Sequence, residues 1–327
     1  MGLTIWCNAK FDDAATARLI EATKNHRLIW AKESDASVLT PGAPDPRLAE
    51  ADIVFGQPEP SQCQASANLR WLEITTAGYT LFDTPEFKES LTGRGAVFTN
   101  MSAVFCEPCA QHLLAMMLSL ARQLPASWRD QASDRPGWAY YPRRAASTLL
   151  NGQTILILSY GSIARRFVEL LQPFGVGKIY ALRRRAYSES GVHIIAEDQL
   201  TAVLPEVDHL VNALPSNDAT HHFVNARRLA LLKPSARFYN IGRGPTVDQS
   251  ALMDALENDR LDAAYLDVMD PEPLPPEHAL WRTKNCHITP HTGGGRSDQD
   301  EAIISHFLDN LAAFERGERD VMTNRIF

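Results

Sequence analysis

The chain has 327 residues, of which 45% are hydrophobic and 22% are charged, and its formal net charge is −7. This composition is typical of a folded globular protein, and the length indicates two domains of ordinary size. The acidic balance and the lack of a long basic run argue against nucleic acid as a partner. No apolar stretch approaches the roughly 20 residues of a membrane span, so we expect no membrane insertion.

The N-terminus and the cysteines indicate a reduced, cytoplasmic protein. Residues 1–6 lack the charged and then apolar segments of a secretory signal and are expected to form a strand. The five cysteines are an odd number and do not suggest a disulfide framework. Cys106 and Cys109 form a C-x-x-C motif that could be redox-active or half a zinc site. It has no second copy and opens an apolar helix, so we favour a packing role and expect no metal.

Strand-like and helix-like segments alternate in the first part of the chain, as in βαβ units around a parallel sheet. We expect strands at 3–7, 53–56, 71–75 and 96–99, and a helix at 12–26. A long apolar helix at 106–124 follows. Segment 125–150 is rich in Arg, Trp, Tyr and Pro, and we expect an extended arm whose Trp138, Tyr140 and Tyr141 pack at a subunit contact.

A second alternating series begins at Thr154. Expected strands are 154–158, 178–182, 209–213, 237–241, 263–268 and 286–289, and expected helices are 162–174, 197–207, 226–233 and 298–316. The fold class is therefore α/β, with two Rossmann-like, doubly wound parallel-sheet domains and an active-site cleft between them.

The strand 154–158 leads into a turn with the spacing of a dinucleotide fingerprint, G-x-G-x-x-G/A. Here it appears as Ser159-x-Gly161-x-x-Ala164. Gly161 would let the backbone approach a pyrophosphate, and the first N–H groups of the next helix would bind the phosphates. Ser159 tolerates positive φ less well than the usual glycine. An ordinary tight βα turn is the alternative interpretation.

Three arginines end the next strand, at Arg183-Arg184-Arg185. An Asp or Glu normally stands there to hold the ribose 2′-hydroxyl of NAD, but the first acid is Glu189. Guanidinium groups suit a 2′-phosphate, so the sequence predicts NADP(H) in preference to NAD(H). A solvated basic turn is the alternative.

Three further blocks carry a family resemblance. They are A-L-P-S-N-D-A-T with L-L-K-P-S-A-R-F-Y-N-I-G-R-G-P-T-V-D, then L-D-V-M-D-P-E-P-L-P, and finally N-C-H-I-T-P-H-T-G-G. Their order and spacing resemble the D-isomer-specific 2-hydroxyacid dehydrogenases, a family that includes glyoxylate/hydroxypyruvate reductases. The resemblance extends from about residue 71 to 316.

The resemblance implies an oxidoreductase that interconverts a 2-keto acid and a (D)-2-hydroxy acid. Arg243 matches the arginine that binds the substrate carboxylate and carbonyl, Glu272 the acidic partner, and His291 the general acid/base. Histidine titrates near neutral pH, a carboxylate beside it favours imidazolium and fixes the ring, and an arginine grips a carboxylate. Each residue alone could be structural; their joint appearance at strand ends favours catalysis.

The resemblance and the fingerprint together give the remaining site residues. The loop T-T-A-G-Y would bind the substrate carboxylate through backbone N–H groups at Ala77, Gly78 and Tyr79. The expected cofactor-binding residues are Ser159, Tyr160, Gly161, Ser162, Ile163, Arg183, Arg184, Ala213, Leu214, Pro215, Ile241, Gly242 and Asp267. His112 is expected to be a packed or interface residue on the apolar helix.

The expected organisation is a discontinuous substrate domain, 1–103 plus 292–327, around a dinucleotide-binding domain at 104–291. The helix and arm at about 105–150 favour a homodimer, as the family implies. A further hypothesis is that Trp138 reaches a neighbouring subunit's active site, as an aromatic does in some relatives. Two other functions stay open: a formate-dehydrogenase-like enzyme, which typically lacks the acid that Glu272 provides, and a non-catalytic dinucleotide-sensing corepressor.

Overall fold

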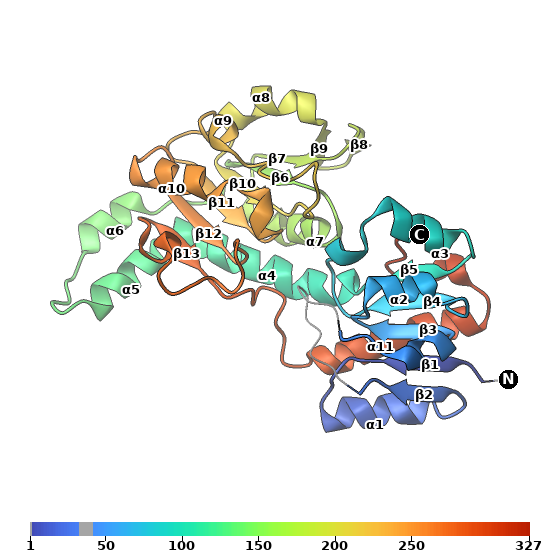
Figure 1. Cartoon of the computed structure of the whole chain (residues 1–327). Coiled ribbons are helices and arrows are strands. Elements are labelled where there is room, and N and C mark those ends of the chain that lie inside the picture. Colours follow the sequence, from blue (N-terminus) through green and yellow to red (C-terminus); the bar gives the residue numbers. More distant parts are fainter. Residues whose placement is uncertain (1, 33–41) are drawn as a thin grey trace. The chain divides into compact units, whose positions relative to one another are not determined.

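The computed structural model describes residues 2–32 and 42–327, which form two compact units (Figure 1). Unit 1 comprises Met1–Phe105 and Arg296–Phe327, and unit 2 comprises Cys106–Gly295. The units thus divide after Phe105 and after Gly295, where the sequence suggested 103 and 291. Helix α4 (Ser102–Ala121) begins in unit 1 and continues into unit 2.

Unit 1 is a parallel sheet with helices on both faces. Among the described residues its strand order is β2-β1-β3-β4-β5, with β1 (Thr4–Cys7), β2 (Arg27–Trp30), β3 (Ile53–Gly56), β4 (Trp71–Ile74) and β5 (Val97–Thr99). The helices are α1 (Asp13–Ala22), α2 (Pro60–Ala65), α3 (Pro85–Thr92) and α11 (Gln299–Glu315). Sequence analysis missed β2, α2 and α3, because β2 is a four-residue edge strand and the helices are short.

Side chains of the unit 1 strands alternate between two cores. Ile5 and Cys7 of β1 face the core that α1 and α11 cover, whereas Trp6 faces the core beneath α2 and α3. Phe307 of α11 stacks on Phe55 of β3 with ring centroids 4.1 Å apart. This two-sided burial explains why the strands read as continuous apolar runs.

Unit 2 contains a larger sheet, with the order β13-β12-β11-β10-β6-β7-β9-β8 in the part of the chain described. Seven strands are parallel: β6 (Thr154–Leu158), β7 (Lys178–Leu182), β9 (Val192–Ile195), β10 (His209–Asn212), β11 (Arg237–Asn240), β12 (Ala263–Leu266) and β13 (Cys286–Ile288). The two-residue β8 (Ser188–Glu189) pairs antiparallel to β9 at the edge. From β9 to β13 this is the Rossmann order, and its direction reverses between β6 and β10.

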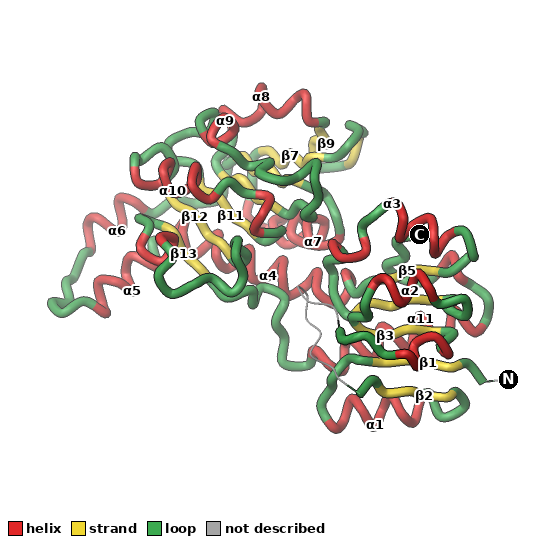
Figure 2. Tube along the Cα trace, in the orientation of Figure 1, coloured by secondary structure: helices red, strands yellow, loops and turns green. Residues whose placement is uncertain are grey.

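Helices cover both faces of this sheet (Figure 2). The helices of unit 2 are α4, α5 (Leu124–Ala132), α6 (Tyr140–Ala146), α7 (Ser162–Leu171), α8 (Leu200–Val203), α9 (Ala226–Leu229) and α10 (Gln249–Glu257). Ile155 and Ile157 of β6 face the core of α4 and α7, and Leu156 and Leu158 face the opposite one. The fold class expected from the sequence is therefore confirmed, with two Rossmann-like α/β sheets.

Several expected elements differ in the structure. The helix expected at 197–207 is a series of short turns around α8, the helix expected at 226–233 ends at Leu229, and α10, β8 and β9 were missed. Short 3-10 helices occupy Pro46–Glu50, Thr80–Phe82, Gln172–Phe174, Glu197–Gln199, Leu204–Glu206, Gly244–Thr246, Ala279–Arg282 and Arg319–Val321.

The expected extended arm is wrong in its local structure, because residues 125–150 contain α5 and α6. Pro125 stands at the start of α5, where a proline costs no hydrogen bond, and Arg143 of α6 pairs with Asp130 of α5 at 2.7 Å. In Figure 1 these two helices project from the remainder of unit 2. Trp138 and Tyr141 are 93% and 81% exposed.

Helix α4 also corrects an expectation, since its 20 residues are long and apolar enough to cross a membrane by length and composition alone. Leu113, Met117 and Leu120 are buried in the core of unit 2. The described chain therefore packs one side of α4 into the core of unit 2, while Leu114, Met116 and Leu118 are only partly buried.

Candidate active site

The fingerprint turn follows β6 at the carboxyl edge of the larger sheet, next to the switch point. Ser159 has φ +86°, so a residue with a side chain occupies the conformation that the usual glycine adopts readily. Gly161 precedes the first turn of α7 with a φ of −90°, and a Cβ at this residue would meet no heavy atom within 4 Å. Neither backbone conformation nor packing within the described chain requires this glycine.

The turns after β10 and β11 approach each other so closely that only glycine fits. A Cβ at Gly242 would lie 2.7 Å from the carbonyl oxygen of Leu214, and one at Gly244 would lie 1.7 Å from that of Met269. These contacts give a packing reason for the G-R-G motif. They hold the backbone of Arg243 between two other strand ends.

A buried polar network, which sequence analysis did not identify, supports the same turn. The Arg243 carbonyl accepts hydrogen bonds from the Thr246 hydroxyl at 2.6 Å and from the Asn240 amide at 3.4 Å. Asn212 donates to Asn240 at 2.9 Å and to Thr246 at 2.7 Å. Because Asn212, Asn240 and Thr246 are buried, their mutual hydrogen bonds keep this network fixed.

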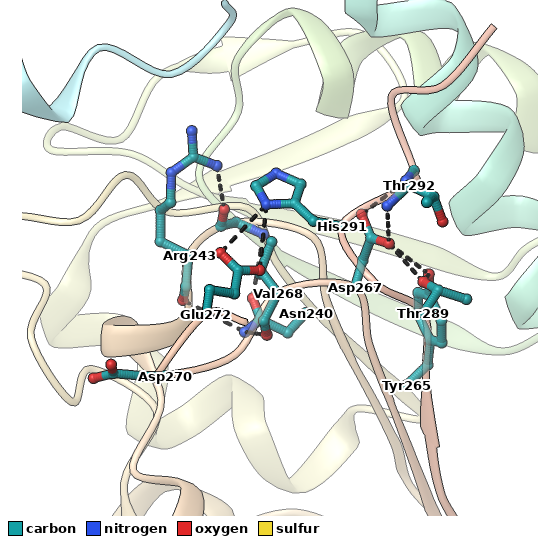
Figure 3. A network of polar contacts seen from close by, with 12 residues as sticks. Asn240, Arg243, Tyr265, Asp267, Val268, Asp270, Glu272, Thr289, His291 and Thr292 are labelled. Atoms are coloured by element: carbon teal, nitrogen blue, oxygen red, sulfur yellow. Dashed lines mark hydrogen bonds and ion pairs between the residues drawn. The ribbon is translucent and has the colours of Figure 1, made fainter. Parts of the chain in front are cut away.

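His291 and Glu272 form a close pair beside Arg243 (Figure 3). His291 Nδ1 lies 3.2 Å and 3.3 Å from the two carboxylate oxygens of Glu272. With the proton on Nδ1 held by the carboxylate, Nε2 is the ring atom left to exchange a proton with a ligand. The structure therefore brings together the three residues expected to be catalytic.

Arg243 is half-buried, and Figure 3 shows its side chain next to those of His291 and Glu272. Burial lowers the pKa of Arg243 from its ordinary value, and the negative charge of Glu272 acts in the opposite direction. Its Nη1 donates to the Gly242 carbonyl at 2.7 Å. The remaining N–H donors of this guanidinium suit an anionic ligand.

The backbone at His291 is held in an uncommon conformation by Asp267. His291 has φ +54°, and its N–H donates to the Asp267 carbonyl at 2.9 Å. The N–H groups of Thr292 and Gly293 both donate to the Asp267 carboxylate at 2.9 Å. We call residues 291–293 the catalytic turn. Asp267, which was expected to bind cofactor, here holds this turn, and its cofactor role stays a prediction.

The three arginines after β7 are exposed, whereas Glu189, the first acidic residue after them, is bound to other side chains. Arg183 Nη1 donates to the Tyr160 carbonyl of the fingerprint turn at 3.3 Å. Glu189 pairs with Arg165 at 2.6 Å and accepts from the Tyr187 hydroxyl at 3.1 Å. Burial, followed by the neighbouring charge of Glu189, raises the pKa of Tyr160 to about 12.

The expected substrate loop lies in unit 1, directly after β4. The carbonyls of Thr76, Ala77 and Gly78 accept from the Met101 N–H at 3.0 Å, the Asn100 amide at 2.6 Å and the Thr76 hydroxyl at 2.6 Å, respectively. Gln57 in turn donates to the Thr76 hydroxyl at 3.0 Å. Within the residues described, the N–H groups of Ala77 and Gly78 donate to no protein acceptor.

The C-x-x-C motif shows no sign of reactive thiols. Burial raises the pKa of Cys109 to about 12, and burial also raises the pKa of Cys106. A thiol must ionise to react or to bind a metal, so these shifts favour the packing role. Across residues 2–32 and 42–327, no group of three or more His, Cys, Asp or Glu side chains has an arrangement that could hold a metal ion.

Comparison with known proteins assigns the chain to a family. Residues 114–293 match the model of the D-isomer specific 2-hydroxyacid dehydrogenase NAD binding domain. The glyoxylate reductase of Pyrococcus furiosus is 33% identical over 254 residues, which cover 76% of this chain and 74% of that protein. The chain belongs to the D-isomer specific 2-hydroxyacid dehydrogenases. It is therefore an NAD(P)-dependent oxidoreductase acting on 2-hydroxy or 2-keto acids.

Solved structures agree with this family. An NADPH-dependent glyoxylate/hydroxypyruvate reductase from Sinorhizobium meliloti, in complex with NADP and malonate, aligns with a TM-score of 0.73 and 26% identity over 96% of this chain and 94% of that one. A D-isomer specific 2-hydroxyacid dehydrogenase from Xanthobacter autotrophicus gives a TM-score of 0.80 at 22% identity, covering 100% and 98%, and supports the fold. In this 2-hydroxyacid dehydrogenase, the matched NAD-binding segment lies within unit 2.

Proposed function

We propose that this 2-hydroxyacid dehydrogenase reduces a small 2-keto acid to the (D)-2-hydroxy acid with NADP(H), using Arg243, Glu272 and His291. The observation that carries the proposal is the His291 Nδ1–Glu272 carboxylate pair at 3.2 Å, with Arg243 beside it at the carboxyl edge of the sheet (Figure 3). Ligands of α/β sheets bind at this edge near the switch point. The similarity to glyoxylate and hydroxypyruvate reductases agrees with a small keto acid.

His291 supplies the proton of the new hydroxyl. Glu272 accepts from Nδ1–H, which fixes the orientation of the ring and leaves Nε2 to deliver its proton to the substrate carbonyl oxygen. In the reverse direction Nε2 accepts the proton of the hydroxyl. The carboxylate also compensates the positive charge that the ring carries when both nitrogens are protonated.

Arg243 binds the carboxylate and the carbonyl oxygen of the substrate. Its planar guanidinium offers several donors in one plane and stabilises the negative charge that develops on the oxygen during reduction. The turn at Ala77, Gly78 and Tyr79 is proposed to bind a substrate carboxylate through backbone N–H groups. The carbonyls of Ala77 and Gly78 accept hydrogen bonds from the protein, whereas the N–H groups of these two residues donate to no acceptor in the described chain.

The dinucleotide is proposed to bind at residues 159–163, 213–215, 241 and 242. The open space above Gly161 fits the pyrophosphate, and the first N–H groups of the ten-residue helix α7 donate to it. When bound, the dinucleotide supplies hydride-transfer chemistry. The residues of the catalytic turn supply the proton chemistry described above.

A preference for NADP(H) follows from the charges after β7. Arg183 and Arg184 are exposed near the fingerprint turn, and Arg183 contacts the Tyr160 carbonyl. Glu189 is occupied by Arg165 and Tyr187, so it does not offer a free carboxylate to a ribose hydroxyl. The complexes of two related enzymes with NADPH or NADP agree with this proposal.

Steady-state reduction of glyoxylate, hydroxypyruvate, pyruvate and bulkier 2-keto acids tests the reaction. We expect oxidation of NADPH by the wild type and its loss in His291→Ala, with the affinity for NADPH retained. Absence of turnover on the whole panel, despite tight dinucleotide binding, would instead support a non-catalytic sensor. Activity retained in His291→Ala would contradict the role of His291.

Dinucleotide affinities test the cofactor preference. We expect NADPH to bind at least about tenfold more tightly than NADH, since a 2′-phosphate gains charge-assisted hydrogen bonds. Arg183→Ala and Arg184→Ala should weaken NADPH while leaving NADH nearly unchanged. Arg227→Ala, an exposed arginine on α9, is the matched control. Equal affinities in the wild type would overturn the preference.

We also propose a cytoplasmic homodimer with no membrane or nucleic-acid partner, in which unit 1 is the substrate domain and unit 2 the dinucleotide domain. The exposed aromatics of the arm and the partly exposed apolar side of α4 support the dimer. The free state of all five cysteines agrees with a reducing compartment. Light scattering that shows a monomer at micromolar concentration would contradict the dimer.

A further inference from the structure

A chain of hydrogen bonds runs from helix α4 to Asp267, outside the set of residues used above. The Thr289 hydroxyl donates to Asp267 Oδ1 at 2.5 Å, and the Tyr265 hydroxyl lies 2.5 Å from the Thr289 hydroxyl. His112 Nε2 forms a hydrogen bond with the Tyr265 hydroxyl. Figure 3 shows Thr289 and Tyr265 beside Asp267, on the side away from Arg243 and Glu272.

The Asp267 carboxylate determines which group is the donor in each hydrogen bond of this chain. An ionised carboxylate only accepts, so the single hydroxyl proton of Thr289 is given to Asp267. The single proton of the Tyr265 hydroxyl is then given to the Thr289 oxygen at 2.5 Å or to Asp267 Oδ1 at 3.4 Å. The Tyr265 oxygen is left to accept from His112, and His112 must therefore carry a proton on Nε2. Burial raises the pKa of Tyr265, which keeps its hydroxyl protonated as a donor.

The ring of His112 also lies near the catalytic turn. A Cβ built on Gly293 would stand 3.7 Å from His112 Cδ2 and 2.7 Å from Asp267 Oδ2. The rings of His112 and Tyr265 are 5.6 Å apart. His112 thus lies near Gly293 and is linked to Asp267 through the hydrogen bonds of Tyr265 and Thr289.

We propose that His112 is a positioning residue for the catalytic turn, acting through Tyr265, Thr289 and Asp267. The donor chain fixes the rotamer of the Asp267 carboxylate, which in turn holds the N–H groups of Thr292 and Gly293. These two backbone hydrogen bonds maintain the uncommon backbone conformation of His291. The effect of His112 on catalysis rests on the proposed function, whereas its hydrogen-bond chain to Asp267 does not.

Hydrogen exchange and histidine NMR test the chain without any substrate. We expect His112 to carry its proton on Nε2 in the wild type, and the Thr292 and Gly293 amides to be protected. His112→Phe and Tyr265→Phe should each speed exchange of these two amides by about tenfold, the size expected for one lost buried hydrogen bond to a charged network. His112→Gln, whose side-chain amide can donate from a similar position, should preserve protection. A proton on Nδ1 alone, or unchanged exchange in both Phe variants, would overturn the proposal.

Kinetics test its consequence for the reaction. In His112→Phe and Tyr265→Phe we expect kcat to fall by about tenfold or more, since a small displacement of a catalytic group is costly, with KM and the affinity for NADPH nearly unchanged. His112→Gln should recover most of kcat. His193→Phe, an exposed histidine on β9, is the matched control. A fall in affinity for NADPH equal to that in kcat would indicate a general structural role and contradict positioning.

The two tests separate two kinds of failure. A wild type without keto-acid turnover overturns the proposed function, and the exchange data then decide the inference by themselves. Normal turnover with unaltered exchange and kcat in both Phe variants overturns the inference and leaves the proposed function intact.

Discussion

Two turns at the carboxyl edge of the unit 2 sheet place a residue with a side chain at positive φ, but they support it differently. Ser159, after β6, has φ +86°, and His291, after β13, has φ +54°. The turn at His291 is held by two backbone N–H bonds to the Asp267 carboxylate. Within the described chain, no charged side chain forms such hydrogen bonds with Ser159.

The strained backbone conformation at His291 is needed for the proposed chemistry, whereas the one at Ser159 is not. An imidazole is needed at position 291, so glycine cannot replace it there, and the surrounding carboxylate stabilises the conformation. At position 159 the backbone alone forms the turn, and the usual fingerprint has glycine. We therefore expect damage when the support of His291 is removed and a gain in stability when Ser159 becomes glycine.

Asp267→Asn should have the largest effect of the changes considered. The variant replaces one acceptor oxygen with an NH₂ group that faces backbone N–H or hydroxyl donors. We expect the free energy of unfolding to fall by about 3 kcal/mol and kcat by about 100-fold. Urea denaturation and steady-state kinetics measure both. Asp270→Asn, an exposed acid three residues along the chain, should change neither; equal effects in the two variants would refute the special role of Asp267.

Gly293→Ala should be the next most damaging. The new methyl group would stand 2.7 Å from Asp267 Oδ2, so the carboxylate or the turn must move. We expect a loss of about 2 kcal/mol in unfolding free energy together with a lower kcat. Gly137→Ala, where the methyl group meets nothing within 4 Å, provides the comparison. Wild-type stability in Gly293→Ala would show that the close approach is not needed.

Thr76→Val tests the loop of unit 1, whose carbonyls are held by neutral groups. The variant keeps the shape but leaves the Gly78 carbonyl and the Gln57 amide without this partner. We expect KM for the keto acid to rise about fivefold, with the affinity for NADPH unchanged and a stability loss of about 1 kcal/mol. Thr76→Ser retains the hydroxyl and should stay close to wild type. An unchanged KM in Thr76→Val would remove this loop from the proposed carboxylate site.

Ser159→Gly should have the smallest effect and the opposite sign. Relief of the positive-φ conformation outweighs the greater flexibility of glycine in the unfolded chain, so we expect a gain of about 1 kcal/mol or less. Thermal unfolding detects such a change. Ser162→Gly, in the first turn of α7, should instead lower the melting temperature. A lower melting temperature for Ser159→Gly would mean that its side chain contributes more than its backbone costs.

Sequence patterns were most informative where burial is two-sided. The strand at 154–158 was predicted with its observed bounds because all but its first residue are buried, giving an uninterrupted apolar run. The edge strands β2 and β8 and the short strand β9 beside β8 were missed, since short or partly exposed strands carry a weak pattern. In the arm, aromatic and proline content suggested extended chain, but the α5–α6 contact through Asp130 and Arg143 allows two helices.

The sequence by itself determined the fold class and pointed to Arg243, Glu272 and His291, because local periodicity, turn residues and motif spacing are properties of the chain. Only the tertiary structure decided what holds them. Tyr265 comes from β12, Asp267 from the residue after it and His112 from α4, and no spacing along the chain signals that His112 meets the other two. Hydrogen bonds between such distant segments depend on how strands and helices pack, which is why the support of the catalytic turn became visible only in three dimensions.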